Sequence, residues 1–457
     1  MDRLGRERRT IAVMIEMYCR DHHREVAAPL CPECRHLLAY SERRLARCRF
    51  GEQKRACGRC AVHCFAPVMR ERTQAVMRYS GPRMTTRHPV LALAHLMDRR
   101  RAQSFQDRVL SSGLLPDPVL RRVVRSRVKG LAESFERLSP PQKAERERAL
   151  LARFETGPIT INADDANRQH YDLPPEFFRL VLGPRLKYSS CFWTPGVIDL
   201  AQAEEAMLAL TAERADLADG QDILDLGCGW GSLALWAAER FPQSRVMAMS
   251  NSREQRAFIE STREERGLAN IEVVTASVAN FDPQRRFDRV VSVEMFEHAR
   301  NHRELLRRVA GWLQPEGKLF VHVFCHRDHL YAFEPDGPGG WMARRFFSGG
   351  IMPSWDYLAR CQEHLELVDR WQVDGSHYAR TLRAWLDNLD HNREAVLPIL
   401  EGVYGRERAR LWLAHWRLFF MVCEETFALG SGREYFVAHY LFKPPGRAAP
   451  SAPRTPL

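Results

Sequence analysis

The amino-terminal part of the sequence contains two pairs of cysteines whose spacing suits metal binding. Cys31-Pro-Glu-Cys34 and Cys57-Gly-Arg-Cys60 are both C-x2-C pairs, and 22 residues separate them. Each pair lets two thiolates converge on one metal ion, and two pairs complete a tetrahedron. The spacing therefore predicts a zinc site or, because such clusters also use four cysteines, an iron–sulfur cluster. Further ligand candidates nearby are Cys48, Cys64, His63, Cys19, His22 and His23.

A second group of residues, in a glycine-rich turn, has the pattern of a ligand-binding site. Asp222-Ile-Leu-Asp-Leu-Gly227-Cys-Gly229-Trp-Gly231-Ser232 reads as an apolar strand, a turn and the start of a helix over 233–240. Backbone N–H groups at such a turn face an anionic group. A dinucleotide site needs G-x-G-x-x-G and an acidic residue about 20 positions on. Here the third glycine comes one residue early, and Ser250 and Asn251 follow the next strand. This disfavours NAD, and D-x-G-x-G-x-G is the usual form in S-adenosylmethionine-dependent methyltransferases.

The elements that must position these residues alternate between strands and helices, which predicts a doubly wound α/β sheet. After the strand at 222–226, further strands are expected at 245–249, 271–275, 288–293, 317–323, 366–373 and 435–442. Helices are expected at 253–266, 302–313, 355–363, 380–389 and 406–428. Ligands bind at the carboxyl ends of such strands. The predicted site therefore comprises Asp225–Gly231, Ser250–Gln255, Ala276–Val278, Glu294–His298 and His322–His326.

Composition sets the class of protein. The 457 residues suffice for more than one domain, and 45% apolar with 27% charged residues exclude disorder for most of the chain. No apolar run reaches the ~18 residues of a membrane span, and no secretion signal is evident, so a cytoplasmic location without structural disulfides is expected. Residues 1–101 hold 22 Lys and Arg against 10 Asp and Glu, which accounts for the net charge of +11. Such a segment attracts nucleic acid, an anionic lipid surface or an acidic protein, or it is a solvated face without a partner.

These patterns divide the chain into four parts. Residues 1–104 form a basic, mainly helical Cys-rich module with a predicted metal site, and residues 105–164 form a helical connector. The connector is interrupted near Pro116 and at Ser139-Pro140-Pro141, and its helices cover the next domain or contact a partner or lipid surface. Residues 165–443 form the α/β domain, and residues 444–457 are a Pro- and Ala-rich tail predicted to be disordered.

Residues 165–443 also resemble a known superfamily. The matching stretches are Leu186-Lys-Tyr-Ser189-Ser-Cys191, the glycine turn, Ser250-Asn-Ser252 with Gln255, Ser292-Val-Glu294-Met-Phe-Glu297-His298, Phe320-Val-His322, Phe346–Ser354 and His377–Thr381. They resemble the cyclopropane-fatty-acyl-phospholipid synthase superfamily, and more closely its coclaurine N-methyltransferase-like branch. The resemblance implies a class I methyltransferase-type doubly wound sheet with helical additions, S-adenosylmethionine as methyl donor and a small amine as acceptor.

The resemblance also assigns donor-binding residues. Ser189, Gly227, Gly229, Asn251 and Gln255 match positions that hold the methionine and ribose parts of the donor. Asp225, Gly231 and Val278 complete the expected donor site. Ser277 stands where the family typically has an Asp that binds the adenine amino group, and this departure predicts weaker donor binding.

Glu294, Glu297 and His298 are the predicted catalytic residues for an amine acceptor. In-line methyl transfer needs neither a metal nor a covalent nucleophile, but it must orient the acceptor and manage one proton and one charge. Glu297 or Glu294 is expected to orient and partly neutralise the ammonium, and His298 to accept the proton. Cys423 stands where the superfamily often has a cysteine designated as catalytic, and a buried packing role is the preferred interpretation.

Alkene chemistry is the alternative within the same resemblance. In members that act on unsaturated acyl phospholipids, a bound bicarbonate serves as base. Its cage here would comprise the backbone of Cys191 with the side chains of Glu297, His322 and Tyr378. Phe324 replaces a usually smaller aliphatic residue, and the long lipid-binding amino-terminal portion of those synthases is absent. Both departures favour a compact amine over a lipid acceptor.

The Cys-rich segment resembles a second family, the nitrous oxide-stimulated promoter proteins. The matching stretches are Thr10-Ile11 with Met17-Tyr-Cys19, Leu30–Cys34, Cys57–Cys60 with His63-Cys64, and Val76–Met84. That family name implies a link to nitrogen-oxide stress and no reaction. It leaves a second alternative function open, a nitrosative-stress regulator that binds metal or nucleic acid and carries a vestigial enzyme domain.

Overall fold

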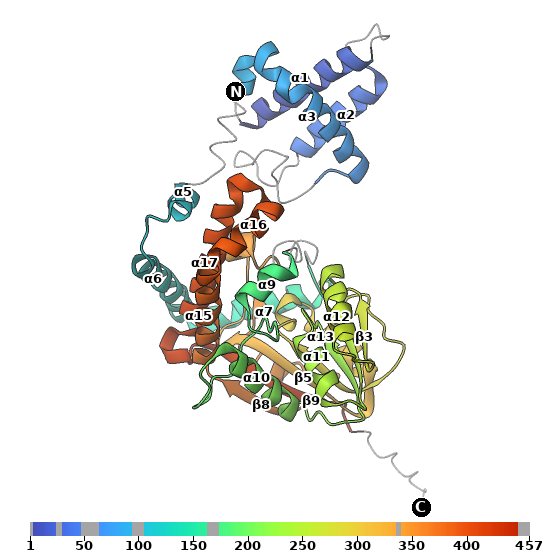
Figure 1. Cartoon of the computed structure of the whole chain (residues 1–457), viewed down its shortest axis with the longest axis vertical. Coiled ribbons are helices and arrows are strands. Elements are labelled where there is room, and N and C mark those ends of the chain that lie inside the picture. Colours follow the sequence, from blue (N-terminus) through green and yellow to red (C-terminus); the bar gives the residue numbers. More distant parts are fainter. Residues whose placement is uncertain are drawn as a thin grey trace, which may run out of the picture. The chain divides into compact units, whose positions relative to one another are not determined.

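The chain divides into two compact units, residues Met1–Ser112 and Gly113–Leu457. The structure is a computed structural model that describes residues 3–23, 30–46, 64–93, 105–161, 173–334 and 340–446. Each unit is described by itself below (Figure 1). No helix in these described ranges combines the length and the apolar character that crossing a membrane requires.

The first unit is helical. Its main helices are α1 (Arg3–His22), α2 (Pro32–Ala46) and α3 (Pro67–Arg87), and α5 (Phe105–Ser112) follows. The apolar face of α1 contributes Ile11 and Ile15 to a small core that also contains Leu37 and Leu45 of α2 and Val76 of α3. Three buried cysteines, Cys19, Cys31 and Cys34, belong to the same cluster.

A seven-stranded sheet forms the centre of the second unit, in the order β3-β2-β1-β4-β5-β9-β8 (Figure 1). The strands are β1 (Asp222–Leu226), β2 (Arg245–Ser250), β3 (Ile271–Thr275), β4 (Phe287–Val293), β5 (Leu313–His326), β8 (Glu366–Val373) and β9 (Tyr435–Lys443). The pairs among β1 to β5 are parallel, and β9 runs antiparallel to both β5 and β8. Because β1 lies centrally and the order reverses beside it, a crevice is expected where β1 and β4 end.

Helices cover both faces of this sheet, as the alternation of buried side chains requires. Val246 and Ala248 of β2 pack in a cluster with α10 (Leu200–Arg214), α11 (Ser232–Arg240) and α12 (Arg253–Glu265). Met247 and Met249 belong to the opposite cluster, with α7 (Pro140–Glu155) and α13 (His302–Trp312). Successive residues of a strand point to opposite faces, so the continuous apolar run of β2 serves both layers.

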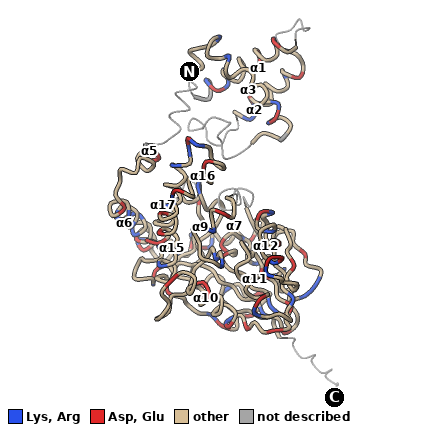
Figure 2. Tube along the Cα trace, in the orientation of Figure 1, with Lys and Arg blue, Asp and Glu red and all other residues tan. Residues whose placement is uncertain are grey.

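A further group of helices adds an apolar cluster beside the sheet. It comprises α9 (Pro175–Val181), α15 (Gly375–His391), α16 (Arg393–Tyr404) and α17 (Arg406–Phe427). Helix α6 (Asp117–Glu136) packs along α17, where Arg121 and Arg125 both pair with the buried Glu425. Figure 2 shows basic and acidic residues on both helices, and two further ion pairs join α6 to α17, Arg121 with Glu424 and Arg417 with Asp117. Of the helices in the predicted connector, α6 and α7 pack within the second unit, whereas α5 belongs to the first.

Some predicted elements differ from the structure. The helix expected at 355–363 is wrong, since only a single 3-10 turn, η4 (Leu358–Arg360), forms there. The backbone N–H of Trp355 donates to His326 and the hydroxyl of Tyr440 donates to the Trp355 carbonyl, so tertiary contacts hold this segment as a turn. Helices α10 and α16 were not predicted, and α15 begins five residues before the expected 380.

Candidate active site

The glycine turn after β1 has the backbone conformation that its sequence predicts. Gly227, Gly229 and Gly231 all have positive φ, which favours glycine. A Cβ at Gly227 would meet the Met295 side chain at 2.6 Å, whereas a Cβ at Gly229 would meet nothing within 4 Å. The turn therefore packs closely against the loop after β4 on one side and faces open space at Gly229.

That open space consists of two hollows that share Gly227, Gly229 and Glu294. The first has an empty volume of about 600 Å³ and the second about 760 Å³. The predicted donor-binding residues that line the first hollow are Ser189, Asp225, Gly227 and Gly229. Those that line the second are Gly227, Gly229, Asn251, Gln255, Ser277 and Val278, together with the predicted catalytic residue His298. Of the predicted donor residues only Gly231 lines neither, because its α-carbon packs against Ile259 of α12.

Polar atoms in these walls lack partners among the described residues, which fits a polar ligand. They include Asp225 Oδ2, Ser232 Oγ and Trp230 Nε1 in the first hollow and Gln255 Nε2 in the second. Burial raises the pKa of Asp225 to about 7. An acceptor, a hydroxyl and an amide donor beside a glycine turn match the amino-acid and ribose groups of S-adenosylmethionine. Ser277 keeps a turn role as well, since its hydroxyl accepts the Ala279 N–H.

Glu294 directly follows β4 and lies at the boundary of the two hollows, where its carboxylate has three hydrogen-bond partners. Its Oε1 accepts the backbone N–H of Ser190 at 2.9 Å and lies 3.2 Å from Nε2 of His322, and its Oε2 accepts the Tyr378 hydroxyl at 2.6 Å. Its φ of +48° is a strained value for a residue with a side chain. Burial raises the pKa of Glu294, while the hydrogen bonds from Tyr378 and Ser190 and the charge of Lys187 oppose that rise.

A chain of hydrogen bonds behind Glu294 fixes the protonation of His322. Arg214 Nη1 lies 2.8 Å from His439 Nδ1, and His439 Nε2 lies 3.0 Å from His322 Nδ1. Arginine only donates, so Nδ1 of His439 accepts and its Nε2 donates to His322. Nε2 of His322 therefore carries a proton and donates to Glu294. Burial lowers the pKa of both histidines well below the ordinary value, so His322 is neutral and already protonated at the nitrogen that faces the site.

Glu297 and His298 lie on the short helix η3 (Phe296–His298) and have different surroundings. Glu297 is fully buried and lines neither hollow, its Oε1 accepts the Phe324 N–H, and its Oε2 has no partner among the described residues. Burial, and then the charge of Glu294, raise the pKa of Glu297 well above the ordinary value. His298 is half-buried, lines the second hollow and stacks on Phe347, and burial lowers its pKa to about 4.

The expected bicarbonate cage is corrected at two positions. Glu294, not Glu297, contacts His322 and Tyr378. The N–H that reaches this centre belongs to Ser190, because the N–H of Cys191 donates to Thr381 instead. Cys423 lies half-buried among apolar side chains, and burial raises the pKa of its thiol, which fits the packing role expected for it.

Sequence reasoning missed three residues of this centre. Lys187 is buried and donates to the Ser189 hydroxyl and the Ser190 carbonyl. His439 and Arg214 orient His322. Lys187 stands inside a motif that carried the resemblance, so it was available as a signal. His439 and Arg214 offered none, because neither belongs to a motif and their contacts with His322 and with each other join residues far apart in the chain.

The doubly wound sheet, the glycine turn and the polar hollows together define an S-adenosylmethionine-dependent methyltransferase. Residues 160–433 match the protein family described as mycolic acid cyclopropane synthetase, and residues 2–108 match the family described as nitrous oxide-stimulated promoter. The chain belongs to the mycolic acid cyclopropane synthetase family.

Known relatives are similar over most of the second unit. (S)-coclaurine N-methyltransferase of Thalictrum flavum subsp. glaucum is 32% identical over 338 residues, which cover 73% of this chain and 94% of the relative. Cyclopropane-fatty-acyl-phospholipid synthase of Escherichia coli (strain K12) is 31% identical over 222 residues, 48% of this chain and 55% of the relative. A solved structure of coclaurine N-methyltransferase bound to N-methylheliamine and SAH superposes with a TM-score of 0.71 at 31% identity, covering 74% of this chain and 98% of that one.

Proposed function

We propose that this enzyme transfers the methyl group of S-adenosylmethionine to the nitrogen of a compact amine, and that Glu294 holds the acceptor. The alternative acceptor, an unsaturated acyl chain, needs bicarbonate as base. The observation that carries the proposal is the hydrogen bonding of the Glu294 carboxylate. Its oxygens already accept from Ser190 N–H, His322 Nε2 and the Tyr378 hydroxyl.

These are the kinds of donor that a bicarbonate would need, so a side-chain carboxylate takes the place of that ion. His322 and Tyr378 were expected to bind bicarbonate, and each instead has Glu294 as its partner. A second anion at the same donors would lie against the Glu294 carboxylate and be repelled by it. The arrangement therefore supports amine chemistry over cyclopropanation.

Glu294 and His298 suit an amine electrostatically. Three donors favour the ionised form of Glu294, and its charge at the shared wall of the hollows attracts a cationic nitrogen. S-adenosylmethionine supplies a methyl group on a positively charged sulfur, which the acceptor nitrogen attacks in line. His298 lines the hollow beside Glu294 and is neutral near pH 7, so its ring is available to accept a hydrogen bond from the acceptor N–H. Burial lowers the pKa of His298, and the charge of Glu294 opposes that effect. His322 holds its proton on Glu294 and orients that carboxylate.

Aromatic rings surround the two polar residues and favour an acceptor with an apolar body. Phe347 stacks on His298 with ring centroids 4.5 Å apart, and Phe427 stacks on Tyr378 at 4.4 Å. Phe324 contacts both phenylalanines. Such rings stabilise a cationic nitrogen and pack on a cyclic amine. The names of the relatives, which include (S)-coclaurine N-methyltransferase and pavine N-methyltransferase, support the same acceptor class.

The regulator with a vestigial enzyme domain is less well supported. A vestigial domain has no need of the open face at Gly229, the partnerless polar atoms of the hollows or the ring of donors around Glu294. All three are present, and each suits catalysis. Binding of nucleic acid by the basic first unit would be a separate property, and it is compatible with an active methyltransferase in the second unit.

The test is a product analysis with the full chain. Purified protein is incubated with labelled donor and either a panel of cyclic secondary and tertiary amines or vesicles of unsaturated phospholipid, and products are identified by mass spectrometry. The proposal predicts N-methylated amines and unmodified lipid. A lipid that gains a methylene group, with no amine product, would refute the acceptor class while leaving donor binding intact.

A further inference from the structure

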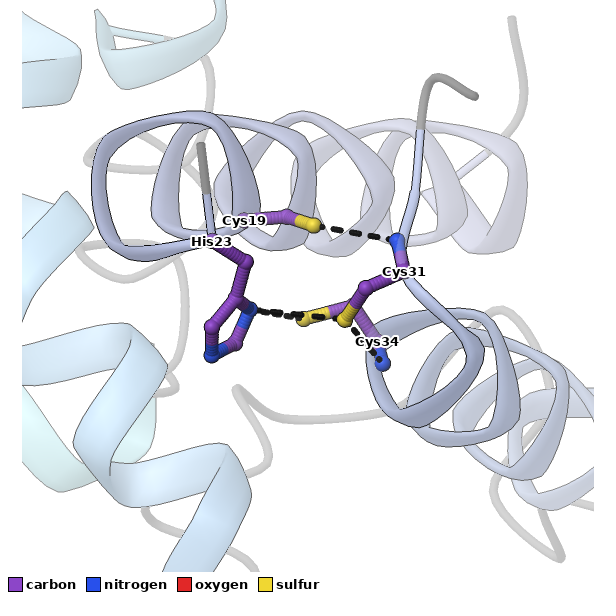
Figure 3. A group of neighbouring side chains, drawn as sticks. All are labelled: Cys19, His23, Cys31 and Cys34. Carbon is purple, nitrogen blue, oxygen red and sulfur yellow. Dashed lines mark hydrogen bonds between the residues drawn. The ribbon is translucent and has the colours of Figure 1, made fainter. Parts of the chain in front are cut away.

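Four metal-ligating side chains converge in the first unit, between α1 and α2. They are Cys19, His23, Cys31 and Cys34, and one potential ligand atom of each lies within 4.8 Å of all the others. Figure 3 shows Cys19 and His23 extending from the end of α1 toward Cys31 and Cys34 at the start of α2. The three cysteines are buried free thiols, and His23 is half-buried. This cluster differs from the predicted pairing of Cys31 and Cys34 with Cys57 and Cys60.

Local structure explains why these four side chains meet. Cys19 lies in the last turn of α1, and the His23 N–H donates to the Cys19 carbonyl, so the two residues share one helical face at i and i+4. The carbonyl of Cys31 accepts the first hydrogen bond of α2 from Arg35, so Cys31 caps that helix and Cys34 lies in its first turn. The ends of two packed helices therefore present a Cys-His pair and a Cys-Cys pair to each other.

The distances between the potential ligand atoms distinguish a single metal ion from an iron–sulfur cluster. In a tetrahedral zinc site with Zn–S bonds of about 2.3 Å, ligand atoms lie about 3.8 Å apart. Nδ1 of His23 is 3.4 Å from the Cys31 sulfur and 3.5 Å from the Cys34 sulfur. In a four-iron cluster each ligand binds a different iron and points outward, which separates the ligands further. The compact spacing thus fits one ion and not a cluster.

The backbone around the cluster suits thiolates. The N–H of Cys31 donates to the Cys19 sulfur at 3.2 Å, and the N–H of Cys34 donates to the Cys31 sulfur at 3.4 Å. Such bonds spread the negative charge of three thiolates on one Zn²⁺ ion. The amino-terminal end of α2, where Cys31 and Cys34 lie, also favours negative charge.

We propose that Cys19, His23, Cys31 and Cys34 bind one zinc ion, a site independent of the methyl acceptor proposed above. Three sulfurs and one nitrogen fill all four tetrahedral positions, so the ion is structural and not catalytic. It joins the carboxyl end of α1 to the amino end of α2 in a unit whose apolar core is small.

Neighbouring candidates provide matched controls. His22, the residue before His23, stacks on Tyr18, and its Nδ1 lies 3.1 Å from the Tyr18 carbonyl. Cys64 is exposed and lies outside the cluster. Of the predicted ligands, Cys48, Cys57 and Cys60 lie outside the described residues.

The experiment measures zinc per chain in the full-length protein by elemental mass spectrometry. His23→Ala, Cys19→Ser and Cys34→Ser are each expected to lose one equivalent relative to the unmodified chain. His22→Ala, Cys64→Ser, Cys57→Ser and Cys60→Ser are expected to lose none from this site. Loss of that equivalent in Cys57→Ser or Cys60→Ser together with its retention in Cys19→Ser and His23→Ala would overturn the proposed ligand set.

Cobalt exchange of the unmodified chain gives a second readout that does not depend on how the variants fold. For the unmodified chain the proposal predicts the visible ligand-field bands of a tetrahedral ion together with a thiolate-to-cobalt charge-transfer band. An iron–sulfur chromophore in the purified protein, or a disulfide among Cys19, Cys31 and Cys34 with no bound metal, would overturn the proposal.

Discussion

Each unit of this chain contains a buried cluster of polar side chains described above, and these two clusters satisfy their polar atoms differently. Around Glu294 every donor has an acceptor, from Arg214 through His439 and His322 to the carboxylate, with Tyr378 on its other oxygen. In the cluster of Cys19, His23, Cys31 and Cys34, sulfur and nitrogen atoms face one another, and the backbone N–H groups of Cys31 and Cys34 donate to two of the sulfurs. The first cluster is complete in itself and presents a charge to a substrate. The second has the composition of a ligand set.

The largest effect expected from this comparison follows removal of the Glu294 charge. Glu294→Gln keeps the size of the side chain, but an amide cannot replace a carboxylate that accepts three hydrogen bonds. Methyl transfer should fall by roughly 10²–10³ in kcat, while donor affinity measured by calorimetry changes little. The control is Glu304→Gln, since Glu304 is an exposed partner of Arg307. Equal turnover in the Glu294 and Glu304 variants would contradict the assigned role.

The same measurement of kcat and donor affinity distinguishes the role of Glu297 from that of Glu294. Glu297 lines neither hollow and accepts the backbone N–H of Phe324, and we propose that it is a positioning residue for β5. Glu297→Gln is expected to lower kcat by a smaller factor than Glu294→Gln and to leave donor affinity unchanged. A larger loss of kcat in Glu297→Gln than in Glu294→Gln would instead indicate that Glu297 faces the acceptor.

A side chain at Gly229 should block donor binding. Gly229→Arg places a long side chain in the open hollow, and a loss of at least about a hundredfold in donor affinity is expected. Gly267→Arg is a matched control, because Gly267 also has positive φ and nothing within 4 Å of an added Cβ. It lies after α12, outside the hollows. Calorimetric titration with the donor should distinguish the variants, and similar weakening in both would attribute the loss to backbone strain alone.

The acid limb of the pH–rate profile should move when Tyr378 loses its hydroxyl. That hydroxyl favours the ionised form of Glu294 and so lowers a pKa that burial raises. Activity that needs ionised Glu294 is present above this pKa and is lost as pH falls through it. In Tyr378→Phe the pKa rises further, so the acid limb should shift to higher pH by about one unit. Profiles of kcat/KM against pH with the same amine check this prediction. An acid limb at the same pH in Tyr378→Phe and in the unmodified chain would contradict the role given to the Tyr378 hydroxyl.

The smallest effect expected is that of a chelator on methyl transfer. The proposed zinc site lies in the first unit, and the amine chemistry derived for Glu294 and His298 uses no metal. Removal of zinc from the full chain should leave the initial rate within about twofold. At the same time, hydrogen exchange of peptides from α1 and α2 should increase. A rate of methyl transfer that falls in proportion to zinc content would show that catalysis depends on the metal, contrary to this prediction.

The sequence predicts the position of the active site better than its internal contacts. Asp225, Asn251, Ser277 and His298 line the hollows because the carboxyl ends of parallel strands meet at one edge. The choice between Glu294 and Glu297 depends on contacts with Ser190 and Tyr378, which lie 104 and 84 residues away in the chain. It also depends on the strained φ of Glu294. Neither feature leaves a periodic pattern.

The metal cluster shows the same limit. Cys31 and Cys34 were identifiable because both ligands lie in one short motif. Cys19 and His23 also have helical i, i+4 spacing, but the partner of a C-x2-C pair depends on how α1 packs against α2. A second C-x2-C pair in the sequence was the more visible signal, and pattern alone does not measure the distance between helices.

The central claim is that Glu294 occupies the position of a bicarbonate base and commits the enzyme to amines. The most direct test is the rate of methyl transfer to a cyclic amine in buffer depleted of carbon dioxide, compared with the same buffer with added bicarbonate. Equal rates and an N-methylated product are expected in both buffers. A rate of methyl transfer to the amine that rises with added bicarbonate would contradict the assignment of Glu294.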